Sequence, residues 1–182
     1  MPDKHMMIDL ETLDTSITAS IISIGAVVFD PRSDTFDDEF KVNISAESNK
    51  RYGRSVSERT MEWWSMQDSA AQMAAFGGPH VDFDQALRDF TVWINRQQPT
   101  CTRVWAKSPD FDCSILSHAC QERGIIWPFK FWEARCVRTI MELAYPNGDF
   151  PFMTMDGPKH DSLADAKKQV LEVQHSFYVL RA

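Results

Sequence analysis

Hydrophobic and polar positions along this chain predict strands first and helices afterwards. Short runs rich in β-branched and aromatic residues, bounded by turn signals, predict strands over residues 6–10, 21–29 and 36–44. The last of these alternates roughly between apolar and polar positions, and the turn at residues 30–33 precedes it. Three successive strands of this kind predict an antiparallel meander at the beginning of a mixed sheet.

Helical periodicity dominates the rest of the chain. Helices are predicted over residues 57–66, 68–76, 82–97, 112–123, 135–144 and 162–180. One further buried strand is predicted over residues 103–106, between the third and fourth of these helices. The polar, locally basic segment 49–59 fits either a surface that follows phosphates or a solvated loop. This order of elements predicts an α/β fold with helices around one mixed sheet.

Length, composition and charge fit one enzyme-sized domain spanning residues 1–182. The chain is 43% hydrophobic and 25% charged, as in an ordinary globular protein with a full core. Its net charge of -7 argues against a broad non-specific binder of nucleic acid, which usually carries a basic face. An enzyme that grips only a strand end is compatible with that charge, since bound divalent cations reverse the sign of an acidic site.

Cysteine usage and apolar runs predict a cytoplasmic protein that contacts no membrane. Cys101, Cys113, Cys120 and Cys136 lack C-x-x-C spacing and a histidine at zinc-finger distance, so we interpret them as reduced thiols. No apolar run approaches the ~20 residues that span a bilayer, and the N-terminus lacks the apolar region of a signal peptide.

Three separated groups of residues carry candidate chemistry, and the first lies on the first strand. Asp9 and Glu11 are two residues apart, so on a strand their side chains point to the same face, ~7 Å apart. Carboxylates so placed suit one or two hard divalent cations. The alternative is a solvated turn at the strand end.

The second group follows the strand at residues 103–106. Asp110 and Asp112 lie at its carboxyl end, where open α/β sheets place ligands. The alternative is helix capping, with Ser108 as the N-cap, Pro109 in the first turn and the two acids favouring the helix dipole.

The third group opens the last helix. Five residues separate His160 from Asp165, which turns a helix by about 500° and leaves the two side chains ~140° apart. We therefore expect His160 on the entering loop and Asp165 in the first turns. Histidine is suited to accept a proton near neutral pH. The alternatives are a surface loop histidine and a capping box formed by Ser162 and Asp165.

Together these groups resemble the motifs of the DEDDh 3′-5′ exonuclease superfamily. The matching segments are residues 8–12, residues 111–112 and residues 160–165. The pair Trp63-Trp64, within residues 60–67, is similar to the branch that contains phage exonuclease A and mycobacterial 3′-5′ exoribonuclease-like proteins. The resemblance covers residues 6 to 175, nearly the whole chain. It implies a ribonuclease-H-like fold, with a five-stranded mixed sheet flanked by helices.

The resemblance also implies roles for individual residues. The metal ligands would be Asp9, Glu11, Asp112 and Asp165, holding two Mg²⁺ or Mn²⁺ ions, with His160 as general base. Asp112 is preferred to Asp110 because the aspartate of the family follows an aromatic residue and opens a helix. Substrate contacts are expected from Thr12, Leu13, Trp63, Trp64 and Phe111.

Neighbouring helical positions are ~100° apart, so Trp63 and Trp64 cannot point into the same place. We expect one indole in the core and the other toward the cleft, where it would stack on a base; the alternative is that both are structural.

The implied reaction is metal-dependent hydrolysis of RNA or DNA from a single-stranded or overhanging 3′ end, releasing nucleoside 5′-monophosphates. Two alternatives stay open: a catalytically silent ribonuclease-H-like module that binds nucleic acid or protein, and an endonuclease on the same fold. Relatives are often dimers, which makes a homodimer an expectation of the resemblance, although the sequence itself carries no dimer signal.

Overall fold

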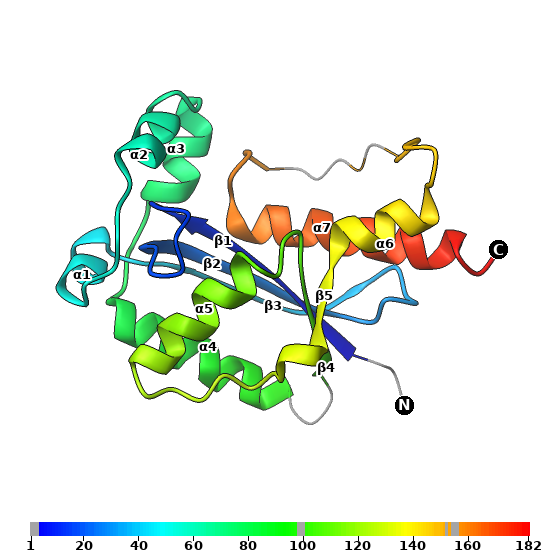
Figure 1. Cartoon of the computed structure of the whole chain (residues 1–182), viewed down its shortest axis with the longest axis horizontal. Helices are drawn as coiled ribbons and strands as arrows, with labels where there is room; N and C mark the ends of the chain where they lie inside the picture. The colour runs from blue at the N-terminus through cyan, green and yellow to red at the C-terminus, as the bar shows by residue number, and fades with distance from the viewer. Residues whose placement is uncertain (1–3, 98–100, 152, 154–156) are drawn as a thin grey trace.

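The computed structural model describes residues 4–97, 101–151, 153 and 157–182. Its centre is a five-stranded sheet with the strand order β3-β2-β1-β4-β5 (Figure 1). The strands are β1 (Lys4–Thr12), β2 (Ile21–Phe29), β3 (Phe36–Asn43), β4 (Cys101–Ala106) and β5 (Ala134–Cys136). β1, β2 and β3 pair antiparallel, whereas β4 pairs parallel with both β1 and β5. The predicted mixed sheet and its opening meander are confirmed.

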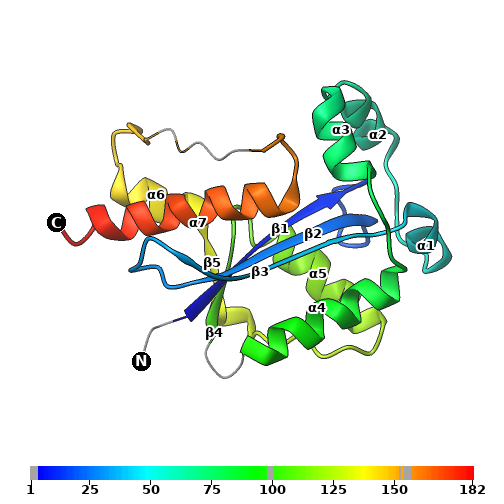
Figure 2. The same cartoon turned by 180° about the vertical axis from the view of Figure 1, so that it is seen from behind.

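Seven α-helices surround this sheet in the described part of the chain. They are α1 (Ala46–Arg51), α2 (Glu58–Ser65), α3 (Ser69–Phe76), α4 (Phe83–Gln97), α5 (Asp112–Glu122), α6 (Val137–Ala144) and α7 (Ser162–Val179). A short 3₁₀ helix at Phe131–Glu133 precedes β5. α4 and α5 lie on one side of the sheet and α7 on the other, as Figures 1 and 2 show.

Two elements differ from the sequence-based prediction. β5 lies partly inside the predicted helix 135–144, because a strand of three half-buried residues is too short to show a period of its own. α1 overlaps the segment interpreted as loop or phosphate-binding surface. It is six residues long, five of them polar, and its N-cap is Ser45, whose side chain accepts a hydrogen bond from the Ser48 N–H.

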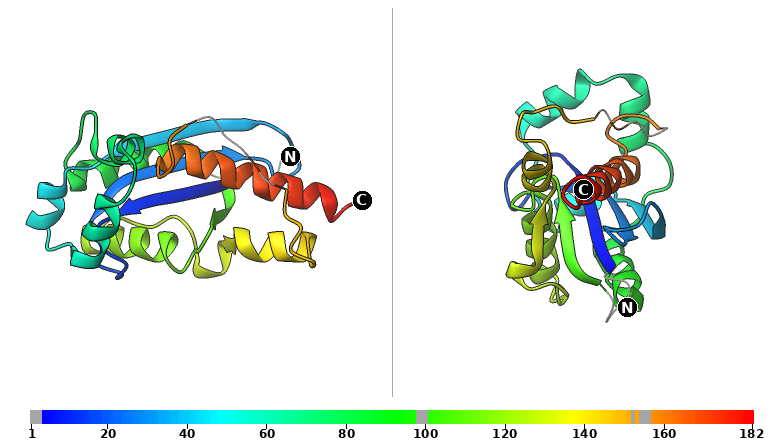
Figure 3. Two further views of the ribbon diagram at one scale, coloured as in Figure 1. Left: turned by 90° about the horizontal axis from the view of Figure 1, so that it is seen from above. Right: turned by 90° about the vertical axis from the view of Figure 1, so that its right-hand side faces the viewer.

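Alternation along β1 divides its side chains between two cores. Met6, Ile8 and Leu10 pack with α4 and α5, whereas Met7 packs beneath α7. Asp9 and Glu11 continue the Met7 series, so they point to the α7 side of the sheet at the carboxyl end of β1. Figure 3 shows α7 running along this side.

Gly25 allows α7 to approach the sheet closely. It lies on β2 directly opposite Asp9, and a Cβ at this position would be 2.2 Å from the backbone carbonyl carbon of Ser162. Only a residue without a side chain lets the first turn of α7 touch the backbone of β2 here. The hydroxyls of Ser23 and Ser162 form a buried hydrogen bond of 2.7 Å beside this contact.

Candidate active site

Asp9 and Glu11 form the β1 part of the site. Asp9 is half-buried and its Oδ1 accepts a hydrogen bond of 2.6 Å from Gln169 Nε2 on α7. Glu11 is 8% exposed. Both carboxyl groups belong to the strand rather than to a solvated turn, as their burial requires.

Asp112 is tied to the same strand from the other side. It is the first residue of α5, is buried, and its Oδ1 accepts a hydrogen bond of 3.0 Å from the Leu10 N–H. The N-cap is Phe111, so the capping role considered for Ser108 is wrong: Ser108 forms a turn before the helix through its carbonyl oxygen. Asp110 is exposed and lies outside the cavity that Asp112 lines.

His160 enters α7 in an unusual conformation. Its φ of 59° is the only positive value for a non-glycine residue in the described chain, and such a backbone costs roughly 1–3 kcal/mol. The His160 N–H donates to Asp165 Oδ2 at 3.1 Å, which holds the loop against the first turns of the helix. Thus His160 is on the loop and Asp165 in the helix, as the spacing predicted.

The predicted capping box at Ser162 is wrong. Asp161 is the N-cap of α7, and its Oδ1 accepts from the N–H groups of Leu163 and Ala164, each at 3.1 Å. Ser162 is the first helical residue, and its hydroxyl forms a hydrogen bond with Ser23 on β2 instead of capping the helix. Lys41 pairs with the other Asp161 oxygen at 2.5 Å.

All five residues of the three predicted motifs line one cavity of about 400 Å³. They are Asp9, Glu11, Asp112, His160 and Asp165. One potential donor atom each from Glu11, His160 and Asp165 lies within 4.8 Å of the other two. The structure therefore brings together acids that are more than 150 positions apart in the sequence.

The carboxyl groups in this cavity resist ionisation. Burial, then repulsion from Asp165 and Asp112, raises the pKa of Glu11 to about 8. Burial raises the pKa of Asp112 to about 7, and burial together with the neighbouring acids raises the pKa of Asp9 well above its ordinary value. The pKa of Asp165 is also raised, chiefly by burial. Clustered acids of this kind are a typical feature of functional sites.

The donor set fits hard divalent cations. Oxygen ligands from several carboxylates are what Mg²⁺ and Mn²⁺ prefer, and such ions would relieve the repulsion that raises these pKa values. Asp9 and Asp112 each use one oxygen to accept a hydrogen bond from a neutral N–H, which orients the carboxylate and leaves its other oxygen for a cation.

Metal-dependent stabilisation is therefore expected to depend on pH. Because the folded pKa values lie above the unfolded values of about 4, these groups stabilise the metal-free fold at low pH, and that contribution is lost as pH rises toward about 7 to 8. Cations bind the ionised form. The increase in Tm caused by Mg²⁺ or Mn²⁺, measured by differential scanning fluorimetry, should grow between pH 5 and pH 8. An increase that is independent of pH would contradict the raised pKa values.

A second cavity, of about 500 Å³, adjoins the first through shared lining residues Leu10, Glu11 and Phe111. Its other lining residues are Thr12, Thr15, Ser57, Arg59, Thr60, Trp63 and Trp64. Among the predicted substrate contacts, Leu13 is the exception. It is buried beside Ile22 and Trp64 and lines neither cavity.

The two tryptophans differ in burial. Trp64 is 2% exposed and its Nε1 donates to the Thr12 carbonyl oxygen at 2.9 Å, whereas Trp63 is 39% exposed. Both nevertheless make T-shaped contacts with the imidazole of His160: the ring centroids are 4.8 Å apart for Trp63 and 5.7 Å apart for Trp64. The expected division into one core indole and one more exposed indole is confirmed by burial. The expectation that the two could not point into the same place is wrong, because both line the second cavity and both rings lie beside that of His160.

The basic segment 49–59 is mostly structural where its contacts are defined. Arg54 is buried, donates to the Ala19 carbonyl oxygen and forms an ion pair of 2.7 Å with Glu122. Arg51 pairs with Asp82. Of these basic residues, only Arg59 lines the second cavity, which we call the aromatic cavity because Trp63, Trp64 and Phe111 line it.

The first cavity, which holds the four acids and which we call the carboxylate cavity, is also lined by residues that the sequence did not point to as site residues: Lys107, Ser108, Arg138 and Gln169. A signal existed for Gln169, which follows Asp165 by four residues and so lies one turn later on the same helix face. Arg138 had no signal, because its helix was predicted to begin too early and β5 was not recognised.

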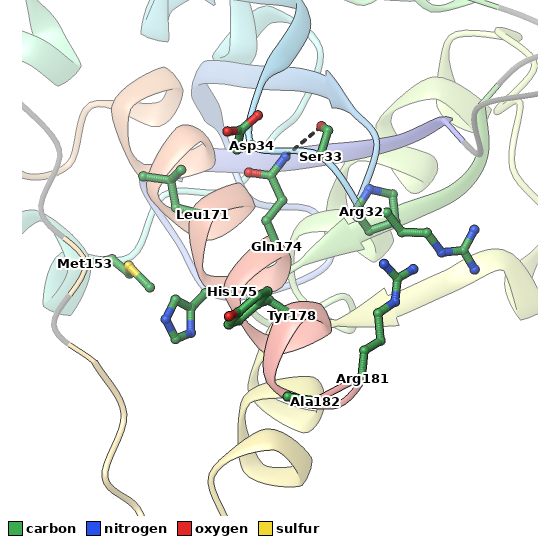
Figure 4. Close-up of a pocket in the computed structure, with 11 residues that line it drawn as sticks. Arg32, Ser33, Asp34, Met153, Leu171, Gln174, His175, Tyr178, Arg181 and Ala182 are labelled. Atoms are coloured by element: carbon green, nitrogen blue, oxygen red, sulfur yellow. Dashed lines mark hydrogen bonds between the residues drawn. The ribbon is translucent and has the colours of Figure 1, made fainter.

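A third cavity, larger than the two described above, lies elsewhere. Its volume is about 720 Å³, and it is lined by the turn after β2 and by the last turns of α7 (Figure 4). Arg32, Tyr178 and Arg181 line it, and Gln174 donates to Ser33 Oγ at 3.3 Å. None of the five motif residues contributes to it, so size alone does not identify the reactive site.

Comparisons with known proteins agree with this arrangement. The sequence model described as "3′-5′ exoribonuclease Rv2179c-like domain" matches residues 4–177. The chain is 27% identical over 199 residues to an exodeoxyribonuclease of Enterobacteria phage T4, covering 93% of this chain and 87% of that protein.

Solved structures of nucleases share the fold. Cell-death related nuclease 4 has a TM-score of 0.65 at 12% identity, over 97% of this chain and 64% of the other. The nuclease domain of 3′hExo, a DEDDh family member bound to rAMP, has a TM-score of 0.62 at 15% identity, over 97% and 92%. A product-bound exonuclease I has a TM-score of 0.65 at 11% identity, over 100% of this chain and 44% of the other. In the described residues, no helix is both long and apolar enough to cross a membrane.

Proposed function

Because the chain belongs to the 3′-5′ exoribonuclease Rv2179c-like domain family and is a 3′-5′ exonuclease, we propose that it hydrolyses nucleic acid from the 3′ end and releases nucleoside 5′-monophosphates. One observation carries the proposal: Asp9, Glu11, Asp112, His160 and Asp165 line a single cavity. A silent binding module would have no use for this costly cluster of acids, which supports an active enzyme.

The proposed chemistry is the attack of water on the terminal phosphodiester. The four carboxylates would hold two Mg²⁺ or Mn²⁺ ions, which supply Lewis-acid stabilisation of charge on the phosphate and on the leaving oxygen. His160 accepts the proton of the attacking water. The bond from phosphorus to the 3′-oxygen of the preceding nucleotide breaks, that oxygen takes up a proton, and the phosphate departs on the 5′ side of the terminal nucleoside.

Trp63 and Trp64 support the placement of the general base. Both indoles lie in T-shaped contact with the imidazole of His160, and the backbone N–H of His160 donates to Asp165 Oδ2. The rotational freedom of the ring is thereby reduced before substrate arrives. Such preorganisation supports a role for His160 in the chemical step rather than as a surface residue.

The adjoining aromatic cavity supports cleavage at a strand end. Phe111 and Trp63 offer ring surfaces beside the acids, where the base of the terminal nucleotide would lie. Stacking tolerates any base, which suits removal of successive nucleotides regardless of sequence. Thr12 lines the same cavity and could contact that nucleotide.

The two tryptophans are expected to respond differently to replacement. Trp63→Ala should raise KM for a short oligonucleotide by about 5- to 100-fold, the equivalent of losing one stacked base, with little change in Tm. Trp64→Ala should lower Tm markedly, because it empties a buried site and leaves the Thr12 carbonyl oxygen without its donor. Steady-state kinetics and thermal unfolding measure both effects, with Trp132→Ala as control, since Trp132 is exposed and lines neither cavity. Equal losses of stability in both variants would mean that neither indole binds a base.

The sugar preference decides between RNA and DNA. The family description names an exoribonuclease and the phage relative is an exodeoxyribonuclease, so both sugars need testing. The protein should be incubated with matched 5′-labelled RNA and DNA strands, single-stranded or with 3′ overhangs, with Mg²⁺ or Mn²⁺. A ladder shortening from the 3′ end, with mononucleotide products, is expected for at least one sugar.

The same assay separates the alternatives. Internal fragments without mononucleotides would indicate an endonuclease. Binding without any cleavage in either cation would indicate a silent module. Size-exclusion chromatography with light scattering tests the homodimer expected from relatives. The four cysteines form no disulfide within the described residues, which is compatible with action in the cytoplasm.

A further inference from the structure

Arg138 reaches the carboxylate cavity from outside the three motifs. It is the second residue of α6, and its Nη1 donates to the Lys107 carbonyl oxygen and to Ser108 Oγ. Those two acceptors belong to the loop that joins β4 to Asp112. The guanidinium is thereby fixed at the rim of the cavity, which Arg138 itself lines.

Among the described residues, Arg138 is also the cation at this cavity that forms no ion pair with a carboxylate, although its charge, against the larger effect of burial, acts to lower the pKa of Asp112. Lys107 also lines this cavity, but its charge is paired: its Nζ lies 2.9 Å and 2.8 Å from Oε1 and Oε2 of buried Glu172. Within the described residues, no carboxylate lies within ion-pair distance of Arg138. Its side chain is exposed, so its remaining N–H groups can reach a ligand that enters the cavity.

Charge counting indicates what that ligand is. Four ionised carboxylates balance two divalent cations, and an entering phosphodiester adds one negative charge that these groups leave unmatched. A guanidinium pairs with phosphate oxygens through charge-assisted hydrogen bonds of fixed geometry. A buried acidic site on a chain of net charge -7 needs such a positive group if it is to admit a phosphate.

We propose that Arg138 binds a non-bridging oxygen of the scissile phosphodiester and positions it against the carboxylate site. This inference rests on the proposed function. The phosphate is taken to be the scissile one because Arg138 lines the cavity of the acids and not the adjoining aromatic cavity.

Arg138→Gln and Arg138→Lys test the proposal, with Arg135→Gln as matched control. Arg135 also carries a guanidinium that donates to backbone carbonyl oxygens, those of Trp132 and Ala134, but it does not line the cavity. Two substrates are compared: a single-stranded oligonucleotide, and a nucleoside 5′-(p-nitrophenyl phosphate), which contains one phosphodiester. Arg138→Gln should lower kcat/KM about 10- to 100-fold for both substrates, as expected for one charged hydrogen bond. Arg138→Lys should recover part of this loss, and Arg135→Gln should resemble the wild type.

Two further measurements exclude a merely structural role. The half-saturating Mn²⁺ concentration and the Mn²⁺-induced rise in Tm should stay within about twofold of wild type in Arg138→Gln, since Asp112 keeps its hydrogen bond from the Leu10 N–H. A changed metal requirement would mean that Arg138 acts by holding Asp112, and would overturn the proposal. A loss confined to the oligonucleotide would place the contact on another phosphate and overturn it as well. If the wild-type protein cleaves neither substrate, the proposed function fails. If the wild-type protein is active and the Arg138 variants are equally active, the inference about Arg138 fails and the proposed function stands.

Discussion

Replacing Asp9 with asparagine is expected to lower kcat/KM for oligonucleotide cleavage at least ~1,000-fold, since metal-assisted charge stabilisation contributes several kcal/mol to such reactions. Asparagine has the same shape, and its side-chain oxygen can still accept from Gln169 Nε2. The variant therefore removes a charge and little else. At pH 8 and without metal, its Tm should exceed that of the wild type, because burial and repulsion from Asp112 and Glu11 oppose the charged form of Asp9.

Digestion of a 5′-labelled oligonucleotide and thermal unfolding in EDTA measure the two effects. Asp149→Asn, which removes one exposed acid from another part of the chain, serves as the control and should behave as wild type. An Asp9→Asn protein that keeps its activity would remove Asp9 from the proposed site. Loss of activity together with a lower Tm in EDTA would show that the Asp9 carboxylate stabilises the fold, contrary to the expectation that its charge destabilises it.

Replacing His160 with alanine should reduce kcat about 10²- to 10⁴-fold, the usual contribution of a general base. Its effect on metal binding should be small if the imidazole handles the proton and does not bind a cation. This distinction matters because one His160 nitrogen lies within 4.8 Å of ligand oxygens on Glu11 and Asp165. The geometry alone is compatible with both roles.

Mn²⁺ titration monitored by Tm separates the two roles. His160→Ala with low kcat and an unchanged Mn²⁺ midpoint is the expected result. A midpoint shifted by tenfold or more would make His160 a ligand instead. His80→Ala provides the control, since His80 is an exposed histidine that lines neither cavity.

The fold was predictable wherever burial imposed a long, clear pattern. β2 is buried throughout, and α4 buries one regular stripe, so both were located close to their true bounds. β5 and α1 were not, because three or six residues cannot display a period, and pairing with β4 or capping by Ser45 decides their structure. Tertiary contacts chose between helix and strand at residues 134–136.

The site was predictable where spacing within one element fixes direction. Two-residue spacing placed Asp9 and Glu11 on one strand face, and helical geometry separated His160 from Asp165. What local spacing could not reveal were contacts between distant segments. The hydrogen bonds of Asp112 to Leu10, of Gln169 to Asp9 and of Arg138 to the Ser108 loop depend on the folded arrangement. Leu13 shows the converse error, where a family position proved to be part of the core.

Gly25 gives this site a property that side-chain packing alone would not. Asp9 and Asp165 come from opposite ends of the chain, and the separation between their elements is fixed where the backbone of β2 touches that of Ser162. Main-chain atoms are much less compliant than side-chain rotamers, so the gap between the two carboxylates, where we propose that cations bind, is set by a rigid backbone contact. Core substitutions elsewhere can therefore accumulate and erode stability while the ligand spacing stays constant. Through Gly25, the spacing of the carboxylates is thereby made independent of substitutions in the rest of the core.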